Sequence, residues 1–223
     1  MNNLESRFHK FIMSINSCEA IDDLPEHTFE GKKADYLLFD RELTFEVKHL
    51  SKDRGAELNR RFSELAMSDP KFPEFFGKVP VEDIISAHAE GEKFRLWALD
   101  YSGRNLKHLI RNADKQIRDT KSSLALKRST GVLILLNEGV PFYNNDFVYN
   151  YVSKVLAKKN SDDSFERSNV ELIWYINEVD RSSHQVYANL FIGPALRNKG
   201  ILNAFDMLES RWASFNAYPV IKS

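Results

Sequence analysis

The stretch ADYLLFDRELTFEVKHL (residues 34–50) decides the fold that we expect for this chain. Residues 34–39 and 43–49 are rich in aromatic and branched apolar side chains, and their short lengths are typical of strands. The charged residues between the two runs indicate a tight turn centred between Asp40 and Arg41. The stretch therefore predicts an antiparallel hairpin of two short strands.

This hairpin brings charged side chains together. With the turn at that place, Asp35 lies opposite Glu46 and Lys33 lies opposite Lys48, with paired Cβ atoms about 4.5–5.5 Å apart. Glu46 and Lys48 are two residues apart, so their side chains share one face of the strand. The hairpin thus gathers two carboxylates and an ammonium group on one side of the sheet, whereas a register shifted by one residue would separate them.

The paired carboxylates indicate a site for a hard cation. Two opposed carboxylates repel each other unless positive charge lies between them. Mg²⁺ prefers oxygen ligands, uses one or two carboxylates, and fills its other positions with water and phosphate oxygens. A lysine beside such an ion can hold or help to deprotonate an attacking water, or stabilise an oxyanion. The alternative is a solvated hairpin face whose charges form a cross-strand ion pair.

These residues resemble a known family of enzymes. Asp35, ten intervening residues and Glu46-Val47-Lys48 are similar to the motif of the PD-(D/E)xK nuclease superfamily, although Ala34 stands where that family usually has proline. The resemblance implies a restriction-endonuclease-like fold and a nuclease that uses Mg²⁺, with Mn²⁺ as a substitute, to hydrolyse phosphodiester bonds in DNA. It also implies that Asp35 and Glu46 are metal ligands and that Lys48 positions or activates the attacking water.

Two further residues match roles in that superfamily by position. Many members carry a glutamine on the helix after the motif strands, facing the active site, and Gln116 occupies this place. The resemblance implies that Gln116 orients the water, Lys48 or a phosphate. Some members take another acidic metal ligand from the first helix, for which Glu5 is the candidate, while Glu19 and Glu30 also lie upstream. An exposed helical glutamine without a catalytic role is the alternative for Gln116.

The helix expected over residues 104–125 carries more basic than acidic residues. Lysine and arginine along one helix suit contacts with DNA phosphates, and a solvated basic face is the alternative. The residues that we expect to bind nucleic acid are Lys107, Arg111, Lys115, Arg118 and Lys121. Three arginines that follow the motif are expected to contact the DNA backbone as well: Arg54, Arg60 and Arg61.

The remaining segments predict helices and strands around one buried strand. GVLILLNE (131–138) is apolar almost throughout, which is typical of a strand buried on both faces. Apolar spacing predicts helices at the N-terminus and over 53–67, 81–90, 104–125, 147–156 and 195–216, and strands over 94–101, 170–178 and 185–193. Asn144 or Asn145 is the expected cap of the helix 147–156. This order favours a mixed α/β class: a restriction-endonuclease-like core with a central mixed β-sheet flanked by helices.

Length and composition fit an ordinary globular protein. The chain has 223 residues, against about 100–200 for a typical domain. We expect a single nuclease-like domain over 1–223, with a helical insertion at about 51–103. Lys and Arg total 31 against 32 Asp and Glu, which gives a formal net charge of −1. This balance excludes a protein held to nucleic acid or membrane by bulk charge, but leaves room for a confined basic face.

The chain has no run of about 18 apolar residues and no signal-peptide pattern, so we expect a cytoplasmic protein without membrane contact. Its single cysteine, Cys18, excludes an internal disulfide and a cysteine-rich zinc site, and we expect it to be a packing residue. The six histidines do not have metal-ligand spacing.

DNA is the expected partner, together with a second copy of the chain or another protein. The alternative function is a non-catalytic nucleic-acid- or protein-binding module on the same fold. That alternative predicts binding without metal-dependent cutting. The presence of Asp35, Glu46 and Lys48 together favours the enzyme.

Overall fold

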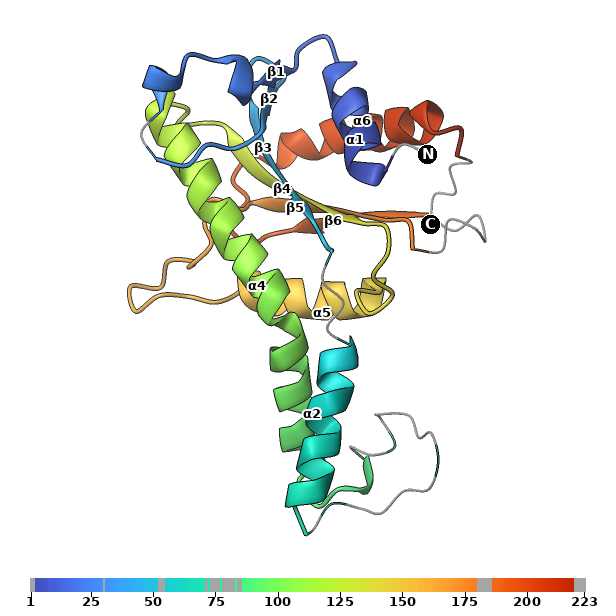
Figure 1. Cartoon of the computed structure of the whole chain (residues 1–223). Helices are drawn as coiled ribbons and strands as arrows, with labels where there is room; N and C mark the ends of the chain where they lie inside the picture. The colour runs from blue at the N-terminus through green and yellow to red at the C-terminus, as the bar shows by residue number, and fades with distance from the viewer. Residues whose placement is uncertain are drawn as a thin grey trace.

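A six-stranded sheet runs through the centre of the molecule, with helices on both of its faces (Figure 1). This computed structural model describes residues 3–29, 31–51, 55–70, 72, 77, 83, 86–179 and 186–218. The strands are neighbours in chain order: β1 (Glu19–Ala20), β2 (Tyr36–Leu38), β3 (Leu43–His49), β4 (Thr130–Asn137), β5 (Leu172–Asn177) and β6 (Tyr187–Ile192). β4 pairs in parallel with both β3 and β5, and the other pairs are antiparallel. The predicted mixed α/β class is confirmed.

The helices are α1 (Leu4–Met13), α2 (Gly55–Ser68), α4 (Gly91–Ser123), α5 (Asn145–Leu156) and α6 (Leu202–Phe215). The predicted cap of α5 is confirmed, because the Asn144 side chain accepts a hydrogen bond from the Phe147 N–H at 2.8 Å. Short 3₁₀ turns span Ile21–Asp23, Glu26–Thr28 and Lys199–Ile201. None of the helices among the described residues combines the length and the apolar character needed to cross a bilayer.

The central strand β4 is buried along its whole length, as its uninterrupted apolar run predicts. Alternate side chains of β4 enter two separate cores. Leu133 and Leu135 pack beneath α4 and α5, while Val132 and Ile134 pack beneath α1 and α6. The two faces of the sheet are therefore distinct, and a side chain on β3 can be assigned to one or the other by its neighbours on β4.

The β2–β3 hairpin has the predicted register. Tyr36 pairs with Phe45 and Leu38 pairs with Leu43. Three consecutive residues of the turn adopt positive φ angles, which is rare outside glycine: Phe39 (51°), Asp40 (50°) and Arg41 (69°). Positive φ angles cost free energy at residues other than glycine. Such a turn persists where the packing of the surrounding structure holds the hairpin in place.

The longest helix corrects one prediction. Residues 94–101, expected as a strand, form part of α4, which is 33 residues long and spans about 50 Å. Ala98 and Tyr101 are buried with Phe62 of α2 in a small third core, and this contact between helices explains the apolar character of the segment. Of the helix expected over 81–90, residues 83, 86 and 87 are helical, residues 88–90 form a bend and a turn, and residues 81, 82, 84 and 85 lie outside the described residues.

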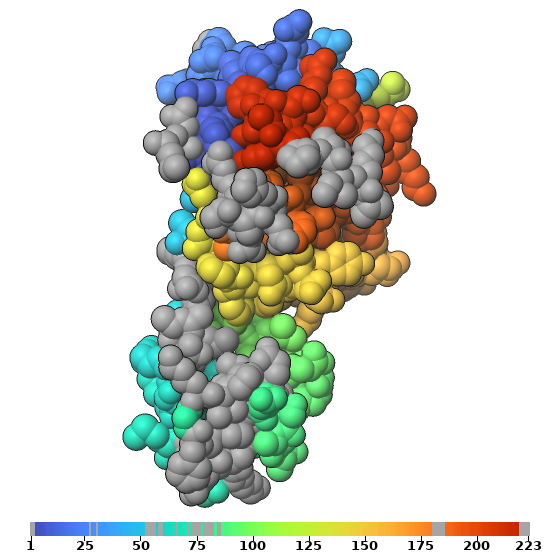
Figure 2. All heavy atoms as spheres, turned by 90° about the vertical axis from the view of Figure 1, so that its right-hand side faces the viewer, coloured from blue at the N-terminus to red at the C-terminus, as the bar shows by residue number. Residues whose placement is uncertain are grey.

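The region predicted as a helical insertion contains α2 and the first turns of α4. These two helices project away from the sheet as an antiparallel pair (Figure 1). Figure 2 shows the same arrangement from another side: the teal and green atoms of this pair form one end of the molecule, beyond the yellow atoms of α5. The sheet and its two cores form the rest.

Candidate active site

Asp35, Glu46 and Lys48 lie on the face of the sheet that α4 covers. Glu46 pairs in register with Leu133 of β4, and Lys48 with Leu135. Both leucines belong to the core beneath α4 and α5. Because paired residues of neighbouring strands point to the same face, the two motif side chains of β3 share that face.

Asp35 lies just before β2 and is held by the backbone of β3. Its N–H donates to the Phe45 carbonyl at 2.9 Å, and its Oδ2 accepts a hydrogen bond from the Val47 N–H at 2.6 Å. Burial raises the pKa of the Asp35 carboxyl, and the hydrogen bond from Val47 and the charge of Lys48 act against this shift. The backbone of the Glu-x-Lys segment therefore orients the first acid of the motif.

Glu46 is completely buried. Lys48 Nζ forms an ion pair with Glu46 Oε1, and neither carboxylate oxygen accepts a well-formed hydrogen bond from the described residues. Burial and the neighbouring Asp35 carboxyl raise the pKa of Glu46 to about 8, against the attraction of Lys48. The structure thus places a second acid against the first, with one ammonium group for two carboxylates.

The donor set fits a divalent cation. A buried carboxylate is costly even when one ammonium group pairs with it, and a second carboxylate beside it adds repulsion. A cation held between Asp35 and Glu46 would remove both penalties, and carboxylate oxygens are the ligands that Mg²⁺ uses. Within the described part of the chain, no group of three or more His, Cys, Asp or Glu side chains could hold a metal ion. In such a site the two carboxylates would be ligands from the protein, and water and substrate would fill further positions.

The upstream acids do not join this pair. Glu5 is an exposed residue in the first turn of α1, and its charge only contributes to the raised pKa of Asp35. Glu19 forms an ion pair with Arg41 at 2.7 Å. Glu30 lies outside the described residues. Glu5, predicted as a third ligand, is therefore left out of the site that we propose below.

Gln116 acts on the backbone that leads into Asp35. Its Nε2 donates to the Lys33 carbonyl at 2.9 Å. One turn further along α4, the fully buried Thr120 accepts a hydrogen bond from the Ala34 N–H at 2.7 Å. Two side chains of α4 thus hold the two residues before Asp35. Thr120 was missed in the sequence, although a threonine three residues after Ile117 on the apolar face was a usable signal.

The residues expected to bind nucleic acid divide into two groups. Lys107, Arg111, Lys115 and Arg118 are exposed on α4. The side chain of Lys121 is only 14% exposed, and its Nζ lies 3.0 Å from Glu171 Oε1. We therefore treat Lys121 as half of a structural ion pair and not as a phosphate contact.

Four of the exposed basic residues of α4 form one stripe, made of Lys107, Arg111, Lys115 and Arg118, and Arg118 is paired with Asp119 at 3.0 Å. At about 100° per residue, the four side chains fall within an arc of about 80°, and Gln116 lies roughly 140° from its centre. The basic stripe therefore occupies the solvent-facing ridge of α4, whereas Gln116 occupies the flank next to the hairpin.

The other predicted arginines add little free charge near the site. Arg60 and Arg61 lie on α2 and both form ion pairs with Glu64, at 2.5 and 3.0 Å. Arg54 lies outside the described residues.

Comparisons of the chain with models of protein families, with curated proteins and with solved structures found no match. The arrangement of Asp35, Glu46 and Lys48 is therefore the main indication of function.

Proposed function

We propose that this protein is a metal-dependent nuclease that hydrolyses phosphodiester bonds in DNA, with a restriction-endonuclease-like core. The observation that carries the proposal is the Glu46 carboxylate, which is buried beside the Asp35 carboxyl and has the Lys48 ammonium as its one charged partner among the described residues. The order of elements supports it: α1, the hairpin with the acidic motif, α4 and the buried strand β4 follow one another as the resemblance implies.

Asp35 and Glu46 would hold the ion, Mg²⁺ or Mn²⁺. When bound, a divalent cation lowers the pKa of a water ligand and neutralises charge on the phosphoryl group. The protein prepares this site in two ways. The Val47 N–H fixes one oxygen of Asp35. Because the buried Glu46 carboxylate is poorly solvated, a bound cation would stabilise its charged form.

Lys48 is the residue that would meet the substrate. Its side chain is 22% exposed while its Nζ contacts Glu46, so the ammonium group links the buried acid to solvent. In that position it can donate to the attacking water or to the negative charge that develops on the phosphate. Gln116 and Thr120 serve as positioning residues, because they contact the backbone before Asp35.

The test is cleavage of plasmid and linear DNA by the purified full-length chain, in Mg²⁺, Mn²⁺ or EDTA. We expect cutting only with a metal ion, and a loss of about 10²-fold or more in Glu46→Gln and Lys48→Met. Glu42→Gln is the matched control, since Glu42 is an exposed acid on the same hairpin. Cutting in EDTA, or full activity in Glu46→Gln, would overturn the proposal. DNA binding with neither metal binding nor cutting would favour the non-catalytic module.

We also propose a cytoplasmic location, where a lone thiol stays reduced. Cys18 suits such a setting because it is a packing residue. Burial, with the charge of Glu19, raises the pKa of its thiol to about 11, so little of the reactive thiolate forms near neutral pH.

A further inference from the structure

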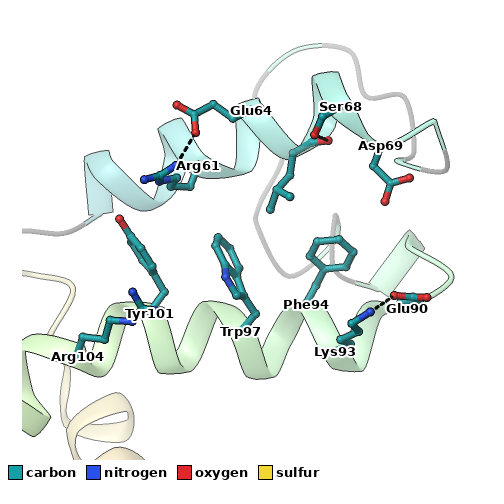
Figure 3. Close-up of a pocket in the computed structure, with 11 residues that line it drawn as sticks. Arg61, Glu64, Ser68, Asp69, Glu90, Lys93, Phe94, Trp97, Tyr101 and Arg104 are labelled. Carbon is teal, nitrogen blue, oxygen red and sulfur yellow. Dashed lines mark hydrogen bonds and ion pairs between the residues drawn. The ribbon is translucent and has the colours of Figure 1, made fainter.

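A groove of about 680 Å³ lies between α2 and the first turns of α4, in the projecting helical pair (Figure 3). The side chains of Phe94, Trp97 and Tyr101 point from α4 into this gap. Trp97 and Tyr101 stack with ring centroids 5.5 Å apart, and Phe62 of α2 packs edge-on against Trp97 at 5.6 Å. Trp97 and Phe94 remain partly exposed, so the groove offers aromatic surface to a ligand.

The groove and the basic stripe lie on the same ridge of α4. At about 100° per residue, Lys93, Trp97 and Arg104 project within the arc that also contains Lys107 and Arg118. The ridge from Lys93 to Arg118 is about 37 Å long at 1.5 Å per residue. From Arg104 to Arg118 the ridge carries cations and leads into an aromatic groove, and the exposed Asp100 lies on the same arc just before Arg104.

Arg104 stands where the stripe meets the groove. Its guanidinium lies over the Tyr101 ring at 5.1 Å, and its side chain is 57% exposed. The only acid paired with it among the described residues is Asp100, at 3.9 Å, which is close to the limit of an ion pair. Arg104 is therefore placed to bind a phosphate while its plane stays on an aromatic ring.

Three cations and three acids line the groove: Arg61, Lys93 and Arg104 against Glu64, Asp69 and Glu90. Arg61 pairs with Glu64 at 3.0 Å and Lys93 pairs with Glu90 at 2.8 Å. The excess positive charge thus lies on the stripe outside the groove, and the aromatic surface lies within it. A ligand with anionic groups along its length and a flat apolar group at its end matches this division.

We propose that this ridge binds single-stranded nucleic acid, with phosphates along the basic stripe and an unpaired base stacked against Trp97 in the groove. A positive groove that follows the backbone, combined with aromatic side chains that stack on bases, is how proteins bind single strands. In a duplex the bases stack on one another, so a duplex cannot fill the groove. The inference rests on the proposed function in that the strand belongs to the DNA substrate. It predicts a substrate with an unpaired segment, such as a branch, gap or tail.

Binding is measured in EDTA, so that it does not depend on cutting. Trp174 and Trp212 are 0% and 2% exposed, which leaves Trp97 as the partly exposed tryptophan of the three. We expect an oligothymidylate to quench tryptophan fluorescence in the wild type but not in Trp97→Phe. We expect Trp97→Ala to weaken binding of a labelled oligonucleotide by about 5- to 150-fold, the range for loss of one stacked base.

Matched controls separate the site from general damage. Leu96→Ala changes an exposed apolar neighbour outside the groove and should bind as the wild type does. Arg111→Glu with Lys115→Glu should weaken binding and its salt dependence, whereas Arg211→Glu, an exposed site on α6, should not. Unchanged binding in Trp97→Ala, an equal loss in Leu96→Ala, or tighter binding of duplex than of single strand overturns the inference.

The outcomes for the two proposals are distinguishable. If the protein cuts DNA with a metal ion but binds no single strand in EDTA, the proposal of single-strand binding is overturned and the proposal of a nuclease stands. If the protein binds single strands through Trp97 but never cuts DNA, the proposal of single-strand binding is supported and the proposal of a nuclease is overturned. If a peptide binds in the groove and oligonucleotides do not change the fluorescence, the proposal of single-strand binding is also overturned.

Discussion

The Val47 N–H donates a hydrogen bond to Asp35 Oδ2 at 2.6 Å, so the central residue of the Glu-x-Lys motif holds the first acid of the site. The side chain of Val47 points to the opposite face, into the core beneath α1 and α6. One residue thus couples the packing of one face of the sheet to the orientation of a carboxylate on the other. Two acids that repel each other are kept together by the backbone as well as by Lys48.

Asp35→Asn and Asp35→Ala should therefore differ in stability. Asparagine keeps an oxygen that can accept from the Val47 N–H and removes a negative charge next to Glu46. Alanine leaves the N–H without its acceptor, at a cost of about 1–3 kcal/mol in the free energy of unfolding. We expect urea denaturation to show this loss in Asp35→Ala alone, and cleavage assays to show loss of cutting in both variants. Equal stability of the two variants would mean that the hydrogen bond contributes nothing.

Without metal, the protein should become less stable as pH rises. The pKa of Glu46 is about 8 in the folded chain and 4.5 in its ordinary state, so the folded form keeps a proton that the unfolded form has lost. The stabilisation is complete below pH 4.5 and is lost as pH rises through about 8, with a slope of up to about 1.4 kcal/mol per pH unit between. The raised pKa of Asp35 acts in the same direction.

Urea denaturation in EDTA at several pH values between 5 and 9 measures this slope. Glu46→Gln should flatten it, because glutamine does not titrate, and Glu42→Gln should leave it unchanged. A wild-type stability that stays level over this range would contradict the buried, unsolvated state of Glu46.

Thr120 should be needed for both stability and activity. Thr120→Val keeps the shape of the side chain but leaves the buried Ala34 N–H without its acceptor, which costs about 1–3 kcal/mol. Because Ala34 precedes Asp35, cutting should fall while DNA binding in EDTA stays the same. Thr120→Ser, which keeps the hydroxyl, should restore both properties, and a failure to do so would assign the effect to packing. Ser122→Ala, on the exposed side of α4, serves as the control.

Lys121 and Lys115 should have opposite effects although they lie six residues apart on one helix. Burial lowers the pKa of Lys121, and Glu171 opposes that shift. Lys121→Met removes the cation from a mostly buried pair and should destabilise the protein by on the order of 3 kcal/mol. Lys121→Met with Glu171→Gln should recover part of this loss. Lys115→Met should leave the melting temperature unchanged and weaken DNA binding. The reverse pattern would contradict the assignment of Lys121 to an ion pair and of Lys115 to DNA binding.

The sequence predicted best where local chemistry decided the structure. The β2–β3 register followed from alternation of side chains and a polar turn, and β4 followed from its unbroken apolar run. The prediction of a strand over residues 94–101 was wrong. The apolar character of this segment comes in part from Ala98 and Tyr101, which pack against Phe62 in a contact between two helices. The pairing of Lys121 with Glu171 joins residues 50 positions apart, which a local pattern cannot predict.

The sequence predicted that Asp35 and Glu46 lie together, but not the contacts of α4 that hold the residues before Asp35. Asp35 and Glu46 lie together because the hairpin places them so. Gln116 donates to the Lys33 carbonyl and Thr120 accepts from the Ala34 N–H. Both hydrogen bonds depend on how α4 crosses the sheet, and the sequence alone did not specify that crossing.

The hydrogen bonds that join α4 to Lys33 and Ala34 close loops of 83 and 86 residues, and the whole projecting helical pair lies inside those loops. The entropy lost on closing a long loop grows only with the logarithm of its length, by about 0.6 kcal/mol for each doubling. A longer or shorter helical pair therefore changes the free energy of closing the site very little. Chain length can be gained or lost at that end of the molecule while the two acids keep their places.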